Sequence, residues 1–394
     1  MRENDFVSID LGASETRVVS NDAVIYELPN NAVFIDRGER VDAAVKRGDT
    51  PHDEIIGALD VTIDKESGTK CEHFPCRVLM GDLAERYSPT CTRPSVLKKK
   101  SEQQINYVSA IVAAAHQVLL GAVEESFEVF LCLPPMEVAY DKDMVAALLC
   151  GTYKVKFNKL EKEVSFEIKM LTCVEEAFMA LTTFFFDKKG KAIEKSKPFA
   201  KGYVLSLDIG ASTTDVAAAK DGRYVEKSGQ TFKTGCNVIQ AFVGNYIRGK
   251  YGYDPTNEEL DSVLRTGRVT RGNRFDDISD ALRRGKAEFA RSIIEQLQNY
   301  FRLVNIPLQT IRAIVVSGGG SLASSYVDED GTNITTTGPV SEFITKELNN
   351  VVDGIEVLTL DTDPREANIL GAYIRAQLEF MLRELKAKKA AEKK

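Results

Sequence analysis

The residues best suited to chemistry occur twice, half a chain apart. Residues 6–18 (FVSIDLGASETRV) align with residues 204–216 (VLSLDIGASTTDV) in a chain of 394 residues. Each copy is an apolar run, typical of a buried strand, that ends in Asp-x-Gly-x-Ser. Glycine lets the backbone of such a turn approach a ligand closely, and the exposed N–H groups with the Ser hydroxyl can cradle phosphate oxygens. The repeat therefore predicts two phosphate-binding turns.

The two turns are expected to grip one polyphosphate between them. Asp10 and Asp208 are the expected ligands of Mg²⁺, through its water shell, because Mg²⁺ dehydrates reluctantly and prefers a few carboxylates plus phosphate oxygens. Arg17 is expected to neutralise phosphate charge. A single turn of this kind is more often only a hairpin, so the prediction depends on the repeat. The expected phosphate contacts are Gly12, Ala13, Ser14 and Arg17 in the first turn and Gly210, Ala211, Ser212 and Thr213 in the second.

A third glycine-rich turn, residues 317–321 (SGGGS), follows the apolar run 311–316. It lacks the Lys-Ser or Lys-Thr ending of a Walker P-loop and the spacing of a Rossmann fingerprint. Two interpretations stay open for Gly318, Gly319 and Gly320. The triplet is either only a turn into a helix, or it also leaves room for a base or ribose against bare backbone.

The rest of the chain alternates helical and strand patterns, which predicts an α/β architecture with helices packed on mostly parallel sheets. Ser101 with Gln104 is a capping-box pattern and predicts a helix that begins there and runs to about residue 119. Thr256 with Glu259 predicts a second helix start, with a helical pattern as far as about Asn305. Residues 129–133 are an expected strand, and residues 171–186 an expected strand that passes into a helix.

The composition of the chain limits the kinds of partner that it can bind. The formal net charge is −7, so no global positive field is available to attract nucleic acid or an anionic membrane, and any contact with DNA is expected to be indirect. No secretory signal and no membrane span is expected, which favours a cytoplasmic location. The seven scattered cysteines suit reduced thiols better than a disulfide framework.

Two other groups have weaker chemical interpretations. Cys71, His73 and Cys76 invite a metal interpretation, but their spacing is unusual for zinc, and a loop with reduced thiols is favoured. His116 lies beside a helical apolar face, where a packed or partly exposed histidine is more common than a catalyst.

Four motifs in this order resemble those of the actin-like ATPases, the superfamily shared with the large heat-shock chaperones and the sugar kinases. The similar segments are residues 10–17 (first phosphate turn), 174–180 (connecting segment), 208–215 (second phosphate turn) and 317–321 (adenosine motif). Within the superfamily the chain is most similar to the ParM-type actins, which segregate plasmids. The shared details are a cation seven residues after the first Asp, the Leu133-Pro134 strand end, Glu176 followed by Ala180, and the short glycine triplet. Arg17 stands where that family usually carries Lys, and its forked guanidinium is expected to alter nucleotide affinity or phosphate geometry.

The resemblance implies a fold of class α/β: two similar actin-like (ribonuclease H-like) domains flanking a nucleotide cleft, each with an inserted smaller subdomain. Domain I would comprise residues 1–199, with an insertion at about 30–100, and would be completed by a C-terminal helix at about 372–394. Domain II would comprise residues 200–371, with an insertion at about 245–300.

The resemblance also implies an activity: ATP hydrolysis, or GTP hydrolysis, with Mg²⁺ and coupled to polymerisation. Glu176 would orient the attacking water, or Glu175 if the alignment slips by one. Asp10 and Asp208 would complete the catalytic set. Gly235 and Lys286 are further expected nucleotide contacts, with Lys286 and Glu288 beside the base. The implied partners are further copies in a filament and a DNA-bound adaptor protein, with no direct nucleic acid and no membrane.

Two alternative functions remain. A small-molecule kinase of the same superfamily would need a carboxylate base, for which Asp10 could serve. An actin-like scaffold for cell shape or division often carries an amphipathic membrane helix, and neither terminus shows a convincing one.

Overall fold

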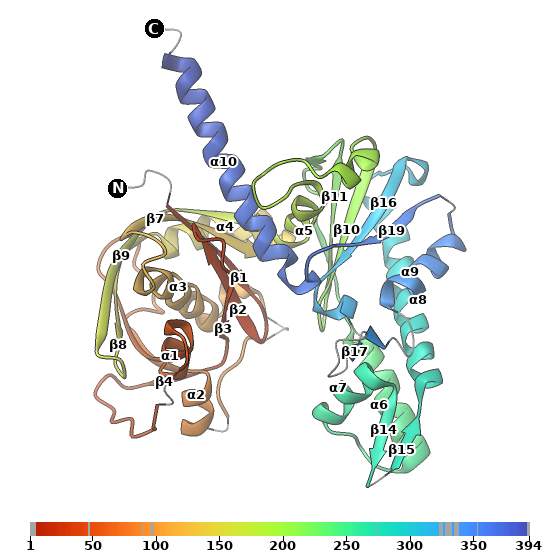
Figure 1. Cartoon of the computed structure of the whole chain (residues 1–394), viewed down its shortest axis with the longest axis horizontal. Coiled ribbons are helices and arrows are strands. Elements are labelled where there is room, and N and C mark those ends of the chain that lie inside the picture. The colour runs from red at the N-terminus through yellow and green to blue at the C-terminus, as the bar shows by residue number, and fades with distance from the viewer. Residues whose placement is uncertain are drawn as a thin grey trace. The chain divides into compact units, whose positions relative to one another are not determined.

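The computed structural model describes residues 5–45, 48–88, 90–95, 98–272, 274–322, 326–327, 333–334, 339–352 and 354–391. The chain forms two compact units (Figure 1). Unit 1 contains Met1–Glu175, Phe186–Lys191 and Asn368–Lys394, and unit 2 contains Glu176–Phe185 and Ala192–Ala367.

Unit 1 is built on a nine-stranded sheet in the order β3-β2-β1-β7-β9-β8-β5-β6-β4. Only β1 with β7 and β7 with β9 are parallel; the other pairs are antiparallel. The expectation of mostly parallel sheets is wrong here. The β1–β2–β3 and β8–β9 hairpins are antiparallel, and residues 30–100 add three more antiparallel strands to this sheet. The strands are β1 (Phe6–Leu11), β2 (Glu15–Ser20), β3 (Tyr26–Pro29), β4 (Ala32–Ile35), β5 (Asp60–Lys65), β6 (Cys76–Met80), β7 (Ser126–Leu133), β8 (Gly151–Phe157) and β9 (Lys162–Glu175).

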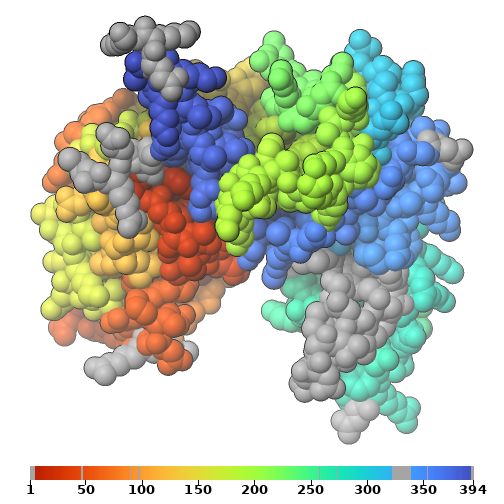
Figure 2. Space-filling view, turned by 45° about the horizontal axis from the view of Figure 1, so that its top comes forward, coloured from red at the N-terminus to blue at the C-terminus, as the bar shows by residue number. Residues whose placement is uncertain are grey.

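Helices cover both faces of this sheet. On one face α3 (Gln104–Leu119) and α4 (Pro135–Leu149) share a core with inward residues of β1 and β7 such as Ile9 and Leu131. On the other face α10 (Ala367–Ala391) packs through Phe380 on Phe6 and Phe130. The C-terminal end of α10 projects at the edge of unit 1 (Figure 2). Two short helices, α1 (Pro51–Gly57) and α2 (Asp82–Tyr87), complete the unit.

The predicted cap at Ser101 is wrong. α3 begins at Gln104 without a side-chain cap, and Ser101 lies in a short 3₁₀ turn, Lys100–Glu102. The Ser101 hydroxyl donates instead to Asp141 of α4 at 2.8 Å, and its backbone N–H donates to Glu137 of α4 at 2.7 Å. Contacts with a helix that follows later in the chain have replaced the local cap.

Unit 2 is built on a six-stranded sheet in the order β12-β11-β10-β16-β19, with β13 also paired to β11. β10 with β16 and β16 with β19 are parallel. The strands are β10 (Tyr203–Ile209), β11 (Thr214–Lys220), β12 (Arg223–Tyr224), β13 (Gln230–Phe232), β16 (Ile311–Ser317) and β19 (Glu356–Thr359), with two separate hairpins, β14 (Arg268–Arg271) with β15 (Arg274–Asp277) and β17 (Tyr326–Val327) with β18 (Asn333–Ile334).

The helices of unit 2 are α5 (Glu176–Phe185), α6 (Asn237–Tyr251), α7 (Asn257–Thr266), α8 (Ser279–Leu303) and α9 (Val340–Asn349). The capping box at the start of α7 is confirmed: the Thr256 hydroxyl accepts from the Glu259 N–H, and Glu259 accepts from the Thr256 N–H, both at 3.2 Å. The helical pattern does not continue unbroken to Asn305. Gly267, with φ +67°, ends α7, and the β14–β15 hairpin separates it from α8.

All seven cysteines are free thiols. Within the described residues, no helix combines the length and the apolar character needed to cross a membrane.

Candidate functional site

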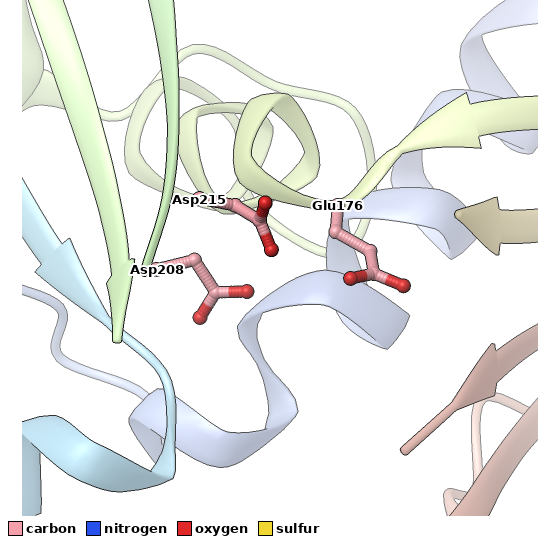
Figure 3. Close-up of side chains that lie close together, drawn as sticks. All are labelled: Glu176, Asp208 and Asp215. Atoms are coloured by element: carbon pink, nitrogen blue, oxygen red, sulfur yellow. The ribbon is translucent and has the colours of Figure 1, made fainter. Parts of the chain in front are cut away.

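Three carboxylates of unit 2 gather at one end of its sheet (Figure 3). Asp208 in β10 and Asp215 in β11 are directly opposite each other in the antiparallel register. Glu176 is the first residue of α5, which packs against these two strands. One oxygen from each carboxylate lies within 4.8 Å of the other two, and all three side chains are largely buried. The tertiary structure thus brings together Glu176 and Asp208, as the sequence predicted, and adds Asp215.

The electrostatics of this cluster favour a cation. Like charges directly opposite on neighbouring strands are destabilising, and burial increases the cost. The Ser317 hydroxyl donates to Asp208 Oδ1 at 3.4 Å, and the Thr231 hydroxyl donates to Asp215 Oδ1. Carboxylate oxygens are the ligands that Mg²⁺ prefers. The donor set therefore fits a divalent cation such as Mg²⁺. No other group of three potential ligands meets in the part of the chain that the structure describes, Cys71, His73 and Cys76 included.

The turn between β10 and β11 presents its tip to solvent beside the cluster. Ala211 is exposed, and Gly210, Ser212 and Thr213 are half-buried. The start of α6 braces this turn, because the Asn237 N–H donates to the Ala211 carbonyl at 2.8 Å. Close approach requires Gly235: a Cβ there would lie 2.5 Å from the Ala211 oxygen. Gly235 therefore supports the predicted phosphate turn from behind.

The third glycine-rich turn closes around the end of β10. Gly318 has φ +83°, and a Cβ there would lie 2.4 Å from Asp208 Oδ1. A Cβ on Gly320 would lie 2.6 Å from Ile209 Cγ2. Only Gly319 is exposed, with ordinary space around it. Two of the three glycines thus have a packing reason beside Asp208, whether or not the turn also contacts a nucleoside.

The first predicted turn lies in unit 1, between β1 and β2. Ala13 and Ser14 at its tip are exposed, and a Cβ on Gly12 would lie 2.6 Å from the Glu15 oxygen. Asp10 is buried and has Arg17 as its register partner. The Arg17 guanidinium also forms ion pairs at 2.9 Å with Glu15 and, on β3, with Glu27. Arg17, the residue expected to neutralise phosphate charge, is therefore held on the β2–β3 surface by two carboxylates.

Part of the chain matches a known protein family, and nearly all of it is similar to solved structures. Residues 206–325 match a family model described as the C-terminal part of archaeal MreB-like actin homologues. Similar solved structures include the actin-like protein Alp7A, with 18% identity and a TM-score of 0.69 over 98% of this chain and 99% of that one. A ParM filament structure from Clostridium botulinum has 15% identity and a TM-score of 0.62 over 95% of this chain and 99% of that one. Bacillus thuringiensis ParM with ATP has 16% identity and a TM-score of 0.60 over 96% of this chain and 100% of that one. No curated protein matches.

The chain has the actin-like fold. The resemblance that the four motifs predicted is confirmed at this level, since the similarity spans both units and includes ParM structures. In this actin-like chain, the first turn belongs to unit 1, and the second and third turns belong to unit 2 together with Glu176.

Asp215 is the acidic residue that motif reading missed. The internal repeat contains the signal, because it aligns Asp215 with Arg17, each seven residues after the Asp of its turn. The two positions are equivalent in the structure as well: Arg17 faces Asp10, and Asp215 faces Asp208. The actin-like repeat therefore pairs opposite charges in unit 1 and like charges in unit 2. This difference makes the acidic pair of unit 2, rather than the Asp10–Arg17 pair of unit 1, the better candidate for binding a cation.

Asn30 is a second residue that the sequence did not reveal. It is fully buried, and its side-chain amide donates to the Gly12 carbonyl at 2.6 Å while its backbone N–H donates to the Ser14 carbonyl at 3.1 Å. Ser109 of α3 donates to its Oδ1 at 2.6 Å. Asn30 thus ties the first turn to α3, a contact between distant segments that no local pattern indicates.

Lys286, the predicted neighbour of the base, is fully buried on α8. Its ammonium lies 5.9 Å from the ring centroid of Phe343 on α9. Burial lowers the pKa of Lys286 to about 7. Glu288 points elsewhere on α8, in an ion pair with Arg291 at 2.9 Å. A base contact by Lys286 stays a prediction.

Proposed function

We propose that this chain is a Mg²⁺-dependent nucleoside triphosphatase, acting on ATP, that polymerises into filaments and disassembles after hydrolysis. The observation that carries the proposal is the buried group Glu176, Asp208 and Asp215 beside an exposed Gly-Ala-Ser turn in an actin-like fold. An acidic cluster that fits a cation, next to an exposed turn with backbone N–H groups, has the two components that a metal-bound polyphosphate needs.

In this proposal each residue has a limited task. Asp208 and Asp215 would hold Mg²⁺, with Asp10 as the further ligand that the sequence predicts, and the metal would supply charge neutralisation at the transferring phosphoryl group. The N–H groups of residues 211–213 and 12–14, with Arg17, bind phosphate oxygens, whereas the Gly210 N–H closes the second turn by donating to the Thr213 carbonyl at 2.8 Å. Glu176 accepts a hydrogen bond from the attacking water and orients it. Positioning and electrostatic stabilisation then provide most of the rate, and no covalent intermediate is needed.

Filament formation is supported by similarity and not by any contact between copies. One of the similar structures is a ParM filament from Clostridium botulinum, and another is Bacillus thuringiensis ParM with ATP. By this analogy the cargo of the filament is plasmid DNA. The net charge of −7 disfavours direct DNA binding, so a DNA-bound adaptor protein would make the connection in the cytoplasm.

The test combines light scattering and pelleting with phosphate release, using Mg-ATP, Mg-GTP, Mg-ADP or no nucleotide. We expect triphosphate to drive assembly. A Glu176→Ala variant should assemble but hydrolyse slowly, by a factor of about 10² or more, and should fail to disassemble. The matched control is Glu175→Ala, which removes the adjacent carboxylate that lies outside the cluster.

Two results would overturn parts of the proposal. Equal loss of hydrolysis in the Glu175→Ala control would remove Glu176 from its role. A protein that binds ATP yet stays monomeric over a wide concentration range would overturn the filament, and phosphate transfer to small hydroxylated substrates would then be screened.

A further inference from the structure

Helix α4 of unit 1 exposes an apolar face. Met136, Tyr140 and Met144 are spaced four residues apart and are between 45% and 75% exposed. Ala139 and Ala147 lie on the same side and are also exposed. The opposite side of α4 is buried in the core of unit 1. A helix that is apolar on both sides is normally covered on both, and Tyr and Met are enriched in protein interfaces.

The end of α10 exposes a second apolar surface. Met381, Leu382 and Leu385 lie within two turns of that helix and are each 50–53% exposed. Among these residues, Arg383 connects the helix to the sheet of unit 1 through an ion pair with Glu128 of β7 at 2.7 Å, and it also pairs with Glu379 at 2.8 Å. Beyond this anchor the helix projects from unit 1 (Figures 1 and 2). Met381, Leu382 and Leu385 are therefore exposed side chains on a regular helix.

The end of α10 carries a net positive charge beside its apolar residues, although Glu384 is also exposed there, and the exposed side of α4 carries Asp143 next to Lys142. Asp143 lies in the exposed face of α4, and Lys386, Lys388 and Lys389 follow the apolar residues of α10. None of these four residues forms an ion pair with another residue that the structure describes. Facing charges of opposite sign favour association and fix its register.

One copy cannot satisfy its own two surfaces, because α4 and α10 lie on opposite faces of the same sheet. Phe130 of β7 points toward α10, where it contacts Phe380. The next residue, Leu131, points to the other face and is the register partner of Cys173, whose thiol donates to the Lys142 carbonyl of α4. Each copy thus carries one surface of each kind, facing in opposite directions.

We propose that the exposed face of α4 binds the end of α10 of a second copy of this chain. Tyr140 and its two methionines pack against Met381, Leu382 and Leu385, with Asp143 facing the lysines. Two different patches make a heterologous contact, which generates an open chain of copies when the rotation from one copy to the next does not close into a ring. The proposal rests on the proposed function, since it names one contact through which the filament assembles.

The first test is zero-length carbodiimide cross-linking, which joins carboxylates to lysines in contact. Pelleted wild-type protein, mixed from ¹⁴N- and ¹⁵N-labelled batches, should give mixed-label peptides that join Asp143 to Lys386, Lys388 or Lys389. Assembled protein in which these peptides are absent or carry only one label would overturn the contact.

The second test uses surface variants whose nucleotide binding and thermal midpoint should match wild type. Tyr140→Ser and Leu385→Ser should each raise the critical concentration for assembly at least about tenfold, because each removes a large apolar side chain from the contact. Asp143→Lys and the double change Lys388→Glu with Lys389→Glu should each raise it a few-fold, and combining the three changes should restore it. Val24→Ser, an exposed apolar residue elsewhere in unit 1, is the matched control.

The outcomes separate this contact from the proposed function. If wild type assembles and the Tyr140→Ser and Leu385→Ser variants assemble equally well, the contact is wrong while the filament stands. If wild type fails to assemble with any nucleotide, the filament function falls and the contact with it.

Discussion

Asp208 and Asp215 face each other across β10 and β11 as two buried acids, so their repulsion is present whenever no cation is bound. Asp215→Asn should therefore stabilise the metal-free protein by about 0.5–1 kcal/mol and weaken its stabilisation by Mg²⁺. Thermal unfolding with EDTA and with Mg²⁺ measures both effects. Glu295→Gln, an exposed acid on α8, is the control and should change neither. An Asp215→Asn variant with an undiminished Mg²⁺ response would remove the cation from this cluster.

His116 is fully buried in unit 1 and is confirmed as a packed residue. Ser20 donates to the Gln117 carbonyl oxygen at 2.7 Å, so the Gln117 amide donates to His116 Nδ1 at 3.0 Å. The remaining ring proton of His116, on Nε2, then points to Nδ1 of His52, also at 3.0 Å. Burial, with a smaller contribution from His52, lowers the pKa of His116 to about 3.

This histidine should make unit 1 sensitive to acid. The folded pKa lies below the unfolded value of about 6.5, so the unfolded chain binds the proton more readily and stability falls as pH falls from 6.5 toward 3. By pH 4.5 the loss should approach about 2–3 kcal/mol. Urea unfolding at pH 7.0 and 4.5 measures it, with His116→Gln as the comparison. An equal pH dependence in that variant would contradict the assignment.

At the scale of elements, the glycines of the turn after β16 are expected to differ in how much each contributes to stability. Gly318→Ala places a Cβ against Asp208 at a positive φ and should destabilise the protein by about 1–3 kcal/mol. Gly319→Ala meets only the Arg365 side chain at 3.7 Å and should cost less than about 0.5 kcal/mol. Urea midpoints of the two variants provide the matched comparison. Equal midpoints would show that the turn relaxes without strain.

Local sequence patterns predicted helix starts correctly where the contacts that form the start are also local. The capping box of Thr256 formed because both partners lie within one turn of α7. The same pattern at Ser101 failed, because Glu137 and Asp141 of α4 bind that residue. The hairpin between α7 and α8 was missed because Arg268–Asp277 carries a single inward apolar residue, Val269, and no alternating pattern.

At the scale of the whole molecule, the proposed nucleotide uses turns from both units. Adding Mg-ATP should therefore slow amide hydrogen exchange at residues 12–17 and at residues 210–215 together, while α7 stays unchanged. Hydrogen exchange followed by mass spectrometry measures each segment. Protection of only one turn would contradict nucleotide binding by both repeats.

The sequence by itself determined the two repeated strands, the turns that follow them and the order of the four motifs. The physical reason is that strand, turn and strand are encoded within about fifteen residues, so burial and turn geometry are readable locally. The repeat made this information stronger, because the same local solution appears as β1–β2 and as β10–β11.

Only the tertiary structure decided which residues meet. Glu176 joins Asp208 and Asp215 because α5 packs on β10 and β11, and Asn30 reaches the first turn because α3 lies beneath it. The strand order that adds β5, β6 and β4 to the sheet of unit 1 also could not be predicted from the sequence. Such contacts join segments distant in the chain, and they are selected by burial of the whole core rather than by any local pattern.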